Sequence, residues 1–230
     1  MRITKDAAEI EATRKAIQLS ENVLARTLEE VHTGMSEREV AAVLSINALK
    51  LGSEGVAFEP LVQVGLGAAY PHGGAGDRII SQGDVLLIDF GYTKADYPAD
   101  ITRTVFVGEP TPELRKIYAV VQAANAAGRA ASKPGVLCQE VDRATRKVID
   151  DAGYGKYFTH RTGHGLGLEG HEPPYIVEGD TTVLEPGMLF TIEPGIYIEG
   201  VGGVRIEDNM VITETGAESL TTFTRDLSTI

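Results

Sequence analysis

The chain has 230 residues, of which 43% are hydrophobic and 23% are charged. This balance is close to the globular average of roughly 45–50% and about 25%, so a disordered chain is excluded and one large domain, or two small halves, is expected. The 33 acidic residues outnumber the 21 basic residues and give a net charge of −12, which argues against binding to nucleic acid or to an anionic membrane surface.

The single cysteine and the lack of long apolar runs indicate the cellular compartment of the protein. Cys138 is the single cysteine, so an internal disulfide and a CxxC metal site are excluded. The opening residues, MRITKDAAEIEATRKA, lack the apolar region of a signal peptide, and no apolar run approaches the ~20 residues of a membrane span. We therefore expect a soluble protein of a reducing compartment, the cytoplasm.

Two helices are predicted first. Apolar side chains recur at spacings of three, four and seven over residues 6–31, which predicts an amphipathic helix. Ser36 and Glu39 have the spacing of a capping box, which predicts a second helix that ends near Leu51. Extended segments bounded by Gly, Asp or Pro are then expected at 56–64, 85–92 and 101–107.

The same order of elements returns after the connector Glu-Pro-Thr-Pro at 109–112. Helices are predicted over 112–131 and 137–152, and glycine-punctuated strands follow to the end of the chain. Two helices followed by strands, twice, predict an α+β fold of two similar halves, about 1–108 and 109–230, around one composite antiparallel sheet. We expect these halves to form a single domain.

Four carboxylates stand in or beside strand-like apolar segments, where an ionised group is costly to bury without a partner; they are Asp89, Asp100, Glu193 and Glu207. If the segments around Asp89 and Asp100 pair as a hairpin, these two side chains face each other and repel unless a proton or a metal lies between them. Asp89 alone also fits a turn before Gly91. Arg205, on the same strand face as Glu207, is an alternative ion-pair partner for it.

Four of the five histidines fall in two places, His72 in YPHGG and three more in HRTGHGLGLEGHEPP, namely His160, His164 and His171. His164 and His171 are seven residues apart, so a straight strand would direct them to opposite faces, whereas a bend at the intervening glycines brings both to one cavity. Each histidine alone also fits a hydrogen-bonded structural role.

Two aspartates, two glutamates and one histidine form a ligand set made mostly of oxygen. Such a set favours a pair of divalent cations, manganese, cobalt, iron or zinc, over a thiolate site. Two adjacent metal ions can activate a bridging water and stabilise a developing oxyanion. Composition and spacing therefore predict a dinuclear hydrolase site without naming its substrate.

Five motifs occur in order along the chain: PHGGAGDRIISQGDVLLIDFG, YPADITRTVFVG, HRTGHGLGLEGHEPP, PGMLFTIEPGIY and GVRIEDNMVIT. With them the chain resembles the catalytic domain of the pita-bread metallopeptidases, in particular the proline dipeptidase and Xaa-Pro aminopeptidase branch. The resemblance implies the pita-bread (creatinase/aminopeptidase) fold, with two pseudo-symmetric halves around a curved antiparallel sheet. It also implies two divalent metal ions, with manganese or cobalt favoured, and hydrolysis of the Xaa-Pro bond of peptides with proline at the second position.

The resemblance further implies roles for individual residues. The metal ligands are Asp89, Asp100, His164, Glu193 and Glu207, with Asp100 and Glu207 bridging the two ions. Glu193 is also the proton acceptor for the attacking water. The outer groups are His72 and His171 at the scissile carbonyl, His160 beside the proline pocket, and Arg205 and Thr102 behind the carboxylate ligands.

Three alternative functions are compared with the prolyl-peptidase interpretation. Methionine aminopeptidases typically separate the last two glutamate ligands more widely and lack a histidine four residues before the metal-binding one, whereas here Glu193 and Glu207 are fourteen residues apart and His160 is present. A non-catalytic binding module and a metal-free creatinase-like hydrolase on the same fold are the alternatives from other classes, and the intact ligand set argues against both. We expect the usual amino-terminal domain of prolyl members to be absent. The choice between dipeptidase and aminopeptidase activity therefore stays open, and so does the formation of a homodimer.

Overall fold

The computed structural model describes residues 2–230 and contains the four predicted helices. They are α1 (Ala7–Glu30), α2 (Glu37–Lys50), α3 (Pro112–Ala131) and α4 (Cys138–Asp151). The predicted capping box is confirmed: Ser36 accepts a hydrogen bond from the Glu39 amide, and the Glu39 carboxylate accepts one from the Ser36 amide. Asp6 and Glu9 form the same arrangement at the start of α1.

The strands are shorter and more numerous than the predicted extended segments. The first half contains β1 (Gly55–Val56), β2 (Leu61–Val64), β3 (Val85–Phe90), β4 (Tyr92–Lys94), β5 (Tyr97–Pro98) and β6 (Ile101–Phe106). The second half contains β7 (Gly163–Gly165), β8 (Glu172–Ile176), β9 (Leu189–Ile192), β10 (Gly195–Ile198), β11 (Gly202–Arg205), β12 (Asp208–Ile212) and β13 (Ala217–Ser219). The predicted segments 56–64 and 85–92 are each divided, because β1 and β4 pair with one another in a separate small sheet.

The strands form antiparallel sheets, which confirms the α+β prediction. The two larger sheets have the strand orders β2-β3-β6 and β13-β12-β9-β7-β8, and two smaller ones are β1-β4-β5 and β10-β11. The larger sheets meet where β6 lies beside the β11–β12 segment. There the Glu207 amide donates to the Thr102 carbonyl at 3.1 Å, and the Thr104 hydroxyl bonds both backbone groups of Arg205. This contact joins the two halves of the chain.

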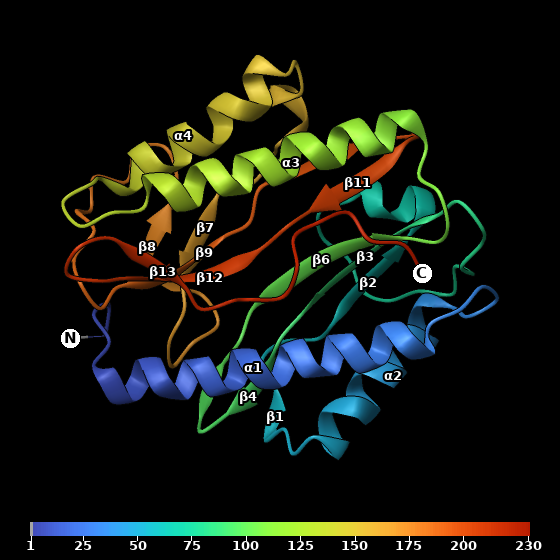
Figure 1. Cartoon of the computed structure of the whole chain (residues 1–230), viewed down its shortest axis with the longest axis horizontal. Coiled ribbons are helices and arrows are strands. Elements are labelled where there is room, and N and C mark those ends of the chain that lie inside the picture. Colours follow the sequence, from blue (N-terminus) through green and yellow to red (C-terminus); the bar gives the residue numbers. More distant parts are fainter. Residues whose placement is uncertain (1) are drawn as a thin grey trace.

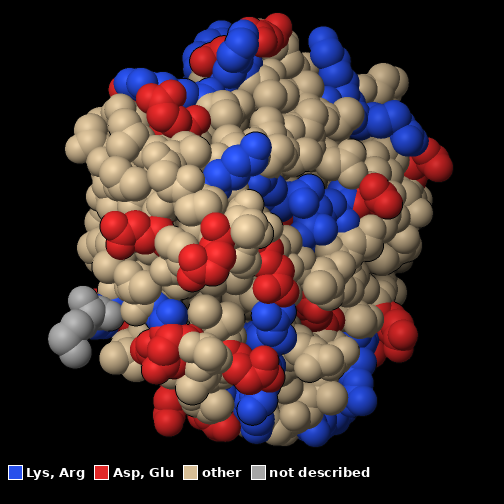
Figure 2. Space-filling model, turned by 60° about the vertical axis from the view of Figure 1, so that its left-hand side comes forward, with Lys and Arg blue, Asp and Glu red and all other residues tan. Residues whose placement is uncertain are grey.

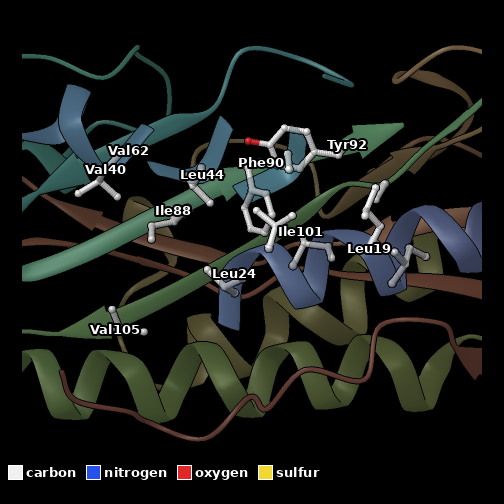
Figure 3. Packing of buried hydrophobic residues seen from close by; sticks show 14 of the residues in the cluster. Leu19, Leu24, Val40, Leu44, Val62, Ile88, Phe90, Tyr92, Ile101 and Val105 are labelled. Carbon is white, nitrogen blue, oxygen red and sulfur yellow. The ribbon is translucent and has the colours of Figure 1, made fainter. Parts of the chain in front are cut away.

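The helices lie on the outside of the strands. In Figure 1 the strands run between α1 and α2 on one side and α3 and α4 on the other. Figure 3 shows Leu24 of α1 and Leu44 of α2 directed at Ile88 and Phe90 of β3, within an apolar cluster that is almost fully buried. Among residues 2–230, no helix is both long and apolar enough to cross a membrane.

Each end of the described chain is bound to the opposite half. Near the amino terminus, the Lys5 amide donates to the Gly187 carbonyl at 2.8 Å, and its buried ammonium group pairs with Glu172 at 2.6 Å. Near the carboxyl terminus, the Ile230 amide donates to the carbonyl of Phe106 on β6 at 2.9 Å. Each end of the chain therefore links its own half to the opposite half.

Candidate metal centre

A cavity of about 780 Å³ opens between the two halves, and nine of the ten site residues predicted from the sequence line it. They are His72, Asp89, Asp100, His160, His164, His171, Glu193, Arg205 and Glu207. Thr102, the tenth, lies behind the cavity wall and is fully buried.

Asp89 and Asp100 reach the cavity from the first half. Residues 85, 87 and 89 share one face of β3, so Asp89 extends a row whose other members, Val85 and Leu87, pack in the apolar cluster beneath α3. Asp100 directly precedes β6, and the β3–β6 register pairs Asp89 with Thr102. Asp89 on β3 and Asp100 at the start of the paired strand β6 are therefore neighbours, but the chain between them forms β4 and β5 rather than a simple hairpin.

The remaining predicted ligands come from the second half. His164 lies in the middle of β7, Glu193 directly follows β9, and Glu207 lies between β11 and β12. Glycines flank His164 because β7 is closely packed: a Cβ atom on Gly163 would overlap the Thr191 carbonyl, and one on Gly165 would overlap the carbonyls of β8. These glycines let the imidazole reach the cavity from a central strand.

The His164 ring is oriented as a metal-binding imidazole. Its Nδ1 lies 3.1 Å from the Gly165 carbonyl, which can only accept, so Nδ1 carries the proton of the neutral ring. The unprotonated Nε2 then faces Asp100 Oδ2 and Glu193 Oε1, each 3.4 Å away. An Nδ1–H fixed by a carbonyl leaves Nε2 available as a ligand.

The five predicted ligands converge in overlapping groups. Ligand atoms of Asp89, Asp100 and Glu207 lie within 4.8 Å of one another, and so do those of His164, Glu193 and Glu207. A third such group combines Asp100 and His164 with His171. Asp89 Oδ1 is buried and has no hydrogen-bond partner among residues 2–230. A cation would satisfy this oxygen, so the donor set fits divalent metal ions.

The electrostatics of the cluster also fit a cation. Burial raises the pKa of Asp100 to about 6 and that of Glu193 to about 7. The pKa of Glu207 is raised well above its usual range, first by burial and then by the charges of Asp100 and Glu193. Carboxylates this close together in a desolvated site either take up protons or hold a positive ion.

Arg205 pairs with Asp89 rather than with Glu207, so the alternative ion pair suggested by the sequence is wrong. Its Nη2 donates to Asp89 Oδ2 at 2.5 Å, and its Nε donates to the Thr102 hydroxyl at 3.1 Å. The Thr102 hydroxyl in turn donates to Glu207 Oε2 at 2.6 Å. Thr102 lies opposite Asp89 in the β3–β6 register, and this placement interposes it between the guanidinium and Glu207.

A second hydrogen-bonded chain leads to His160. The Tyr197 hydroxyl accepts from Arg205 Nη1 at 2.7 Å and lies 2.8 Å from His160 Nε2. His160 Nδ1–H donates to the Arg161 carbonyl at 2.8 Å, so Nε2 accepts a hydrogen bond from the Tyr197 hydroxyl. Burial, together with the charge of Arg205, lowers the pKa of His160 to about 3 and keeps its ring neutral. Sequence reasoning missed Tyr197, whose place in the motif PGMLFTIEPGIY was the available signal.

His171 and His72 form the outer part of the cavity wall. The rings of His171 and His164 have centroids 3.9 Å apart. The chain reverses between the antiparallel strands β7 and β8, in the segment that contains Gly167 and Gly170. The bend expected at the intervening glycines is therefore present, and both histidines line one cavity. Burial, then the charge of His164, lowers the pKa of His171 to about 4. His72 follows Pro71, whose carbonyl accepts from Arg205 at 3.3 Å.

The outer wall contains further residues that the sequence did not single out. Phe58 and Glu59 come from the first half, and Arg161, Tyr175 and Asp180 from the second. On the molecular face in Figure 2, acidic and basic side chains are interspersed.

Comparisons with known proteins place the chain and its fold in one family. The profile of metallopeptidase family M24 matches residues 11–214. The Xaa-Pro dipeptidase of Pyrococcus furiosus is 45% identical over 99% of this chain and 65% of its own length. The structure of an X-Pro aminopeptidase from Thermotoga maritima superposes with a TM-score of 0.98 at 43% identity, covering 100% of this chain and 65% of that one.

The prolidase of Pyrococcus horikoshii gives a TM-score of 0.97 at 43% identity, over 99% of this chain and 65% of the prolidase chain. The chain thus spans about two thirds of the length of these relatives. The match to solved prolyl peptidases confirms the pita-bread fold that the motifs implied. With the profile match across most of its length, this chain belongs to metallopeptidase family M24.

Proposed function

We propose that this chain is a dinuclear metal-dependent exopeptidase that hydrolyses the Xaa-Pro bond at the amino terminus of peptides. The observation that carries the proposal is the convergence of five side chains from both halves in one cavity, namely Asp89, Asp100, His164, Glu193 and Glu207. Relatives named Xaa-Pro dipeptidase and X-Pro aminopeptidase support the substrate class.

We assign the five converging residues as the side chains that would hold two divalent cations. The oxygen-rich set with one imidazole suits manganese or cobalt better than a thiolate-binding metal. When bound, such ions polarise the scissile carbonyl and lower the pKa of an attacking water. Thr102 and Arg205 hold Glu207 and Asp89 in position through the hydrogen bonds described above.

Glu193 is the proton acceptor in this proposal. In the metal-free protein, burial raises the pKa of Glu193 to about 7, so this carboxylate takes up a proton more readily than an exposed one. The Thr191 hydroxyl donates to Glu193 Oε1 at 3.2 Å and orients the carboxylate. Its Oε2 lies 4.0 Å from His160 Nδ1, so the carboxylate faces the cavity beside the neutral imidazole.

The histidines around the cluster bind the substrate. His72 and His171 stand on the cavity wall outside the ligands, where they contact the scissile carbonyl oxygen and stabilise the charge that develops on it. His160 packs edge-on against Phe158, with ring centroids 5.1 Å apart, and lies 5.4 Å from the Tyr197 ring. This aromatic corner suits the apolar ring of proline.

We also propose that the protein works in the cytoplasm, since its one cysteine, Cys138, is buried and unpaired. The formation of a homodimer by this chain remains a prediction.

The proposal is tested with metal-stripped protein reloaded with manganese, cobalt or zinc. The substrates are Xaa-Pro dipeptides, longer Xaa-Pro peptides and Met-Xaa peptides without proline. We expect about two ions per chain by elemental analysis and cleavage of Xaa-Pro substrates only, both lost on chelation. Cleavage of Met-Xaa in preference to Xaa-Pro would contradict the proposal, and so would Xaa-Pro hydrolysis that survives complete removal of metal.

A further inference from the structure

A buried ion pair lies under the loop that carries His171. The Lys5 ammonium group is 2.6 Å from Glu172 Oε1, and the two side chains are 1% and 5% exposed. Two charges are costly to bury unless they are paired in good geometry, so loss of one partner leaves an uncompensated charge in the interior. Glu172 directly follows His171, which lines the cavity, whereas Lys5 comes from the opposite half. The attachment made by the first half therefore ends beside a residue of the cavity wall.

The loop between β7 and β8, residues 166–171, is folded around this ion pair. A Cβ atom on Gly167 would lie 2.5 Å from Glu172 Oε1 and 2.9 Å from Lys5 Cε, so the glycine lets the backbone pack against both charged side chains. The Gly167 amide donates to the Glu169 carbonyl at 3.1 Å. The Glu169 amide faces Glu172 Oε2 at 3.4 Å. The carboxylate thus binds Lys5 through one oxygen and faces the loop backbone with the other.

The backbone of Lys5 is fixed to the second half. Its amide donates to the Gly187 carbonyl at 2.8 Å, and a Cβ atom on Gly187 would lie 2.7 Å from the Lys5 carbonyl oxygen. The preceding residue, Thr4, pairs with Met188 in an isolated antiparallel bridge directly before β9. Strand β9 pairs with β7 and leads to Glu193. The Lys5 ammonium group is therefore held in a constant position relative to the ligand cluster.

The outer part of the loop has little apolar packing of its own. Leu168 is 62% exposed, and a Cβ atom on Gly170 would meet no other atom within 4 Å. The His171 ring rests against His164, with centroids 3.9 Å apart. Segments that bury few apolar contacts open locally at low cost unless other contacts hold them. The polar contacts of Glu172 therefore determine where the His171 imidazole stands.

Building on the proposed function, we propose that Lys5 is a positioning residue, which acts through Glu172 to hold His171 where it contacts the scissile carbonyl oxygen. Lys5 does not line the cavity and does not touch the substrate itself. His171 is assigned to the charge that develops during the reaction, and a shift of about 1 Å in such a group can cost roughly 100-fold in rate. Loss of the ion pair should therefore lower kcat more than it changes KM. The metal ligands come from other segments and should keep their ions.

The test is a double-mutant cycle in the manganese-loaded full chain, with Ala-Pro as the substrate. Lys5→Met is combined with His171→Ala, and Lys147→Met, at an exposed pair with Asp151, is the control. We expect Lys5→Met to lower kcat by roughly 10- to 100-fold with an unchanged manganese content. The double variant should be no slower than His171→Ala alone, because the effect of positioning disappears with the residue that is positioned. Lys147→Met should match the wild type.

Lys5→Met leaves the Glu172 carboxylate without its buried partner and can impair folding. Lys5→Met/Glu172→Gln, which removes both charges, then takes its place in the cycle with the same expected outcome. Independent losses would overturn the inference: if the combined variant is slower than His171→Ala by the full factor that the change at Lys5 causes alone, Lys5 does not act through His171.

Hydrogen exchange of residues 166–172, followed by mass spectrometry, tests the hold on the loop without turnover. We expect faster exchange over these residues in Lys5→Met than in the wild type and Lys147→Met, and equal exchange in all three would overturn the inference. A wild type that binds manganese but does not cleave Ala-Pro would contradict the proposed function. Faster loop exchange in Lys5→Met would, in that case, still support the positioning of His171 by Lys5.

Discussion

The Thr102 hydroxyl donates a 2.6 Å hydrogen bond to Glu207, across the contact where the two halves of the chain meet. Both residues are buried. We expect Thr102→Val, which keeps the shape but removes the donor, to reduce metal affinity or activity by roughly 10- to 100-fold, as observed when partners of metal ligands are removed. Thr102→Ser should restore most of the loss, and the exposed Thr181→Val is the control. Metal titration against a competing chelator measures the effect, and equal affinity in Thr102→Val and wild type would contradict it.

Glu193 is expected to be needed for the chemical step more than for binding. Glu193→Gln keeps an oxygen that can face the metal but cannot accept a proton from water. We expect kcat to fall by about 10²- to 10⁴-fold, the usual contribution of a general base. Steady-state kinetics with an Xaa-Pro dipeptide provide the measurement, with the exposed Glu199→Gln as control. A variant with near-normal kcat would exclude Glu193 as the base.

Arg205 should not tolerate replacement by lysine. Its planar head bonds Asp89, Thr102 and Tyr197 at the same time, which a single ammonium group cannot reproduce. We expect Arg205→Lys to lower kcat/KM by roughly 10- to 100-fold. Arg143→Lys, at an exposed ion pair on α4, should have little effect. The comparison is informative once circular dichroism shows that both variants are folded.

The metal-free protein should become less stable as the pH rises. The pKa of Glu193 is raised to about 7, mainly by burial, and such a carboxyl stabilises the folded state below its unfolded pKa and loses that contribution as the pH passes 7. Glu193→Gln removes this dependence. In the presence of chelator we expect similar stability of variant and wild type near pH 5. Near pH 8 the variant should be more stable by an amount on the order of 3 kcal/mol, since one pKa unit corresponds to about 1.4 kcal/mol.

Thermal unfolding at several pH values gives this comparison directly. A stability difference that does not grow between pH 5 and pH 8 would show that burial of Glu193 costs nothing in the metal-free protein. Saturating manganese should reduce the difference or reverse its sign, because a bound cation favours the ionised carboxylate.

The apolar contact between α2 and β3 provides a test of the fold that is independent of the metal. Leu44 is fully buried in the cluster of Figure 3, whereas Leu49 on the same helix is 75% exposed. We expect Leu44→Ala to lower the free energy of unfolding by about 2–5 kcal/mol. Leu49→Ala should change it by no more than about 0.5 kcal/mol. Urea unfolding of both variants checks the pair, and equal losses would show that the cluster is not packed as described.

The helices could be predicted closely because their signals are local. The period of the apolar side chains and the Ser36–Glu39 capping box act within one element and need no partner. The division of residues 56–64 and 85–92 could not be predicted, since it depends on β1 pairing with β4, strands far apart in the chain. Polar residues in apolar segments identified the candidate ligands because their burial cost is visible in the sequence alone.

The partners of those ligands were harder to predict. That Arg205 bonds Asp89 rather than Glu207 follows from the register of β6 against β3 and from the contact between the halves. Tyr197 and Arg161 were missed for a related reason. Neither breaks a local pattern. Arg161 lines the cavity, and Tyr197 bonds Arg205 and His160, only when β7, β8 and β10 are assembled.

The attachment of each chain end to the opposite half determines how a ligand can reach the cavity. Lys5 fastens the first half to the second through Glu172, and Ile230 fastens the second half to the first through Phe106. Swinging the halves apart like a hinge would break both attachments together with the backbone contacts at Thr102. A ligand of the cavity therefore has to enter through its existing opening, without a hinge-like separation of the two halves.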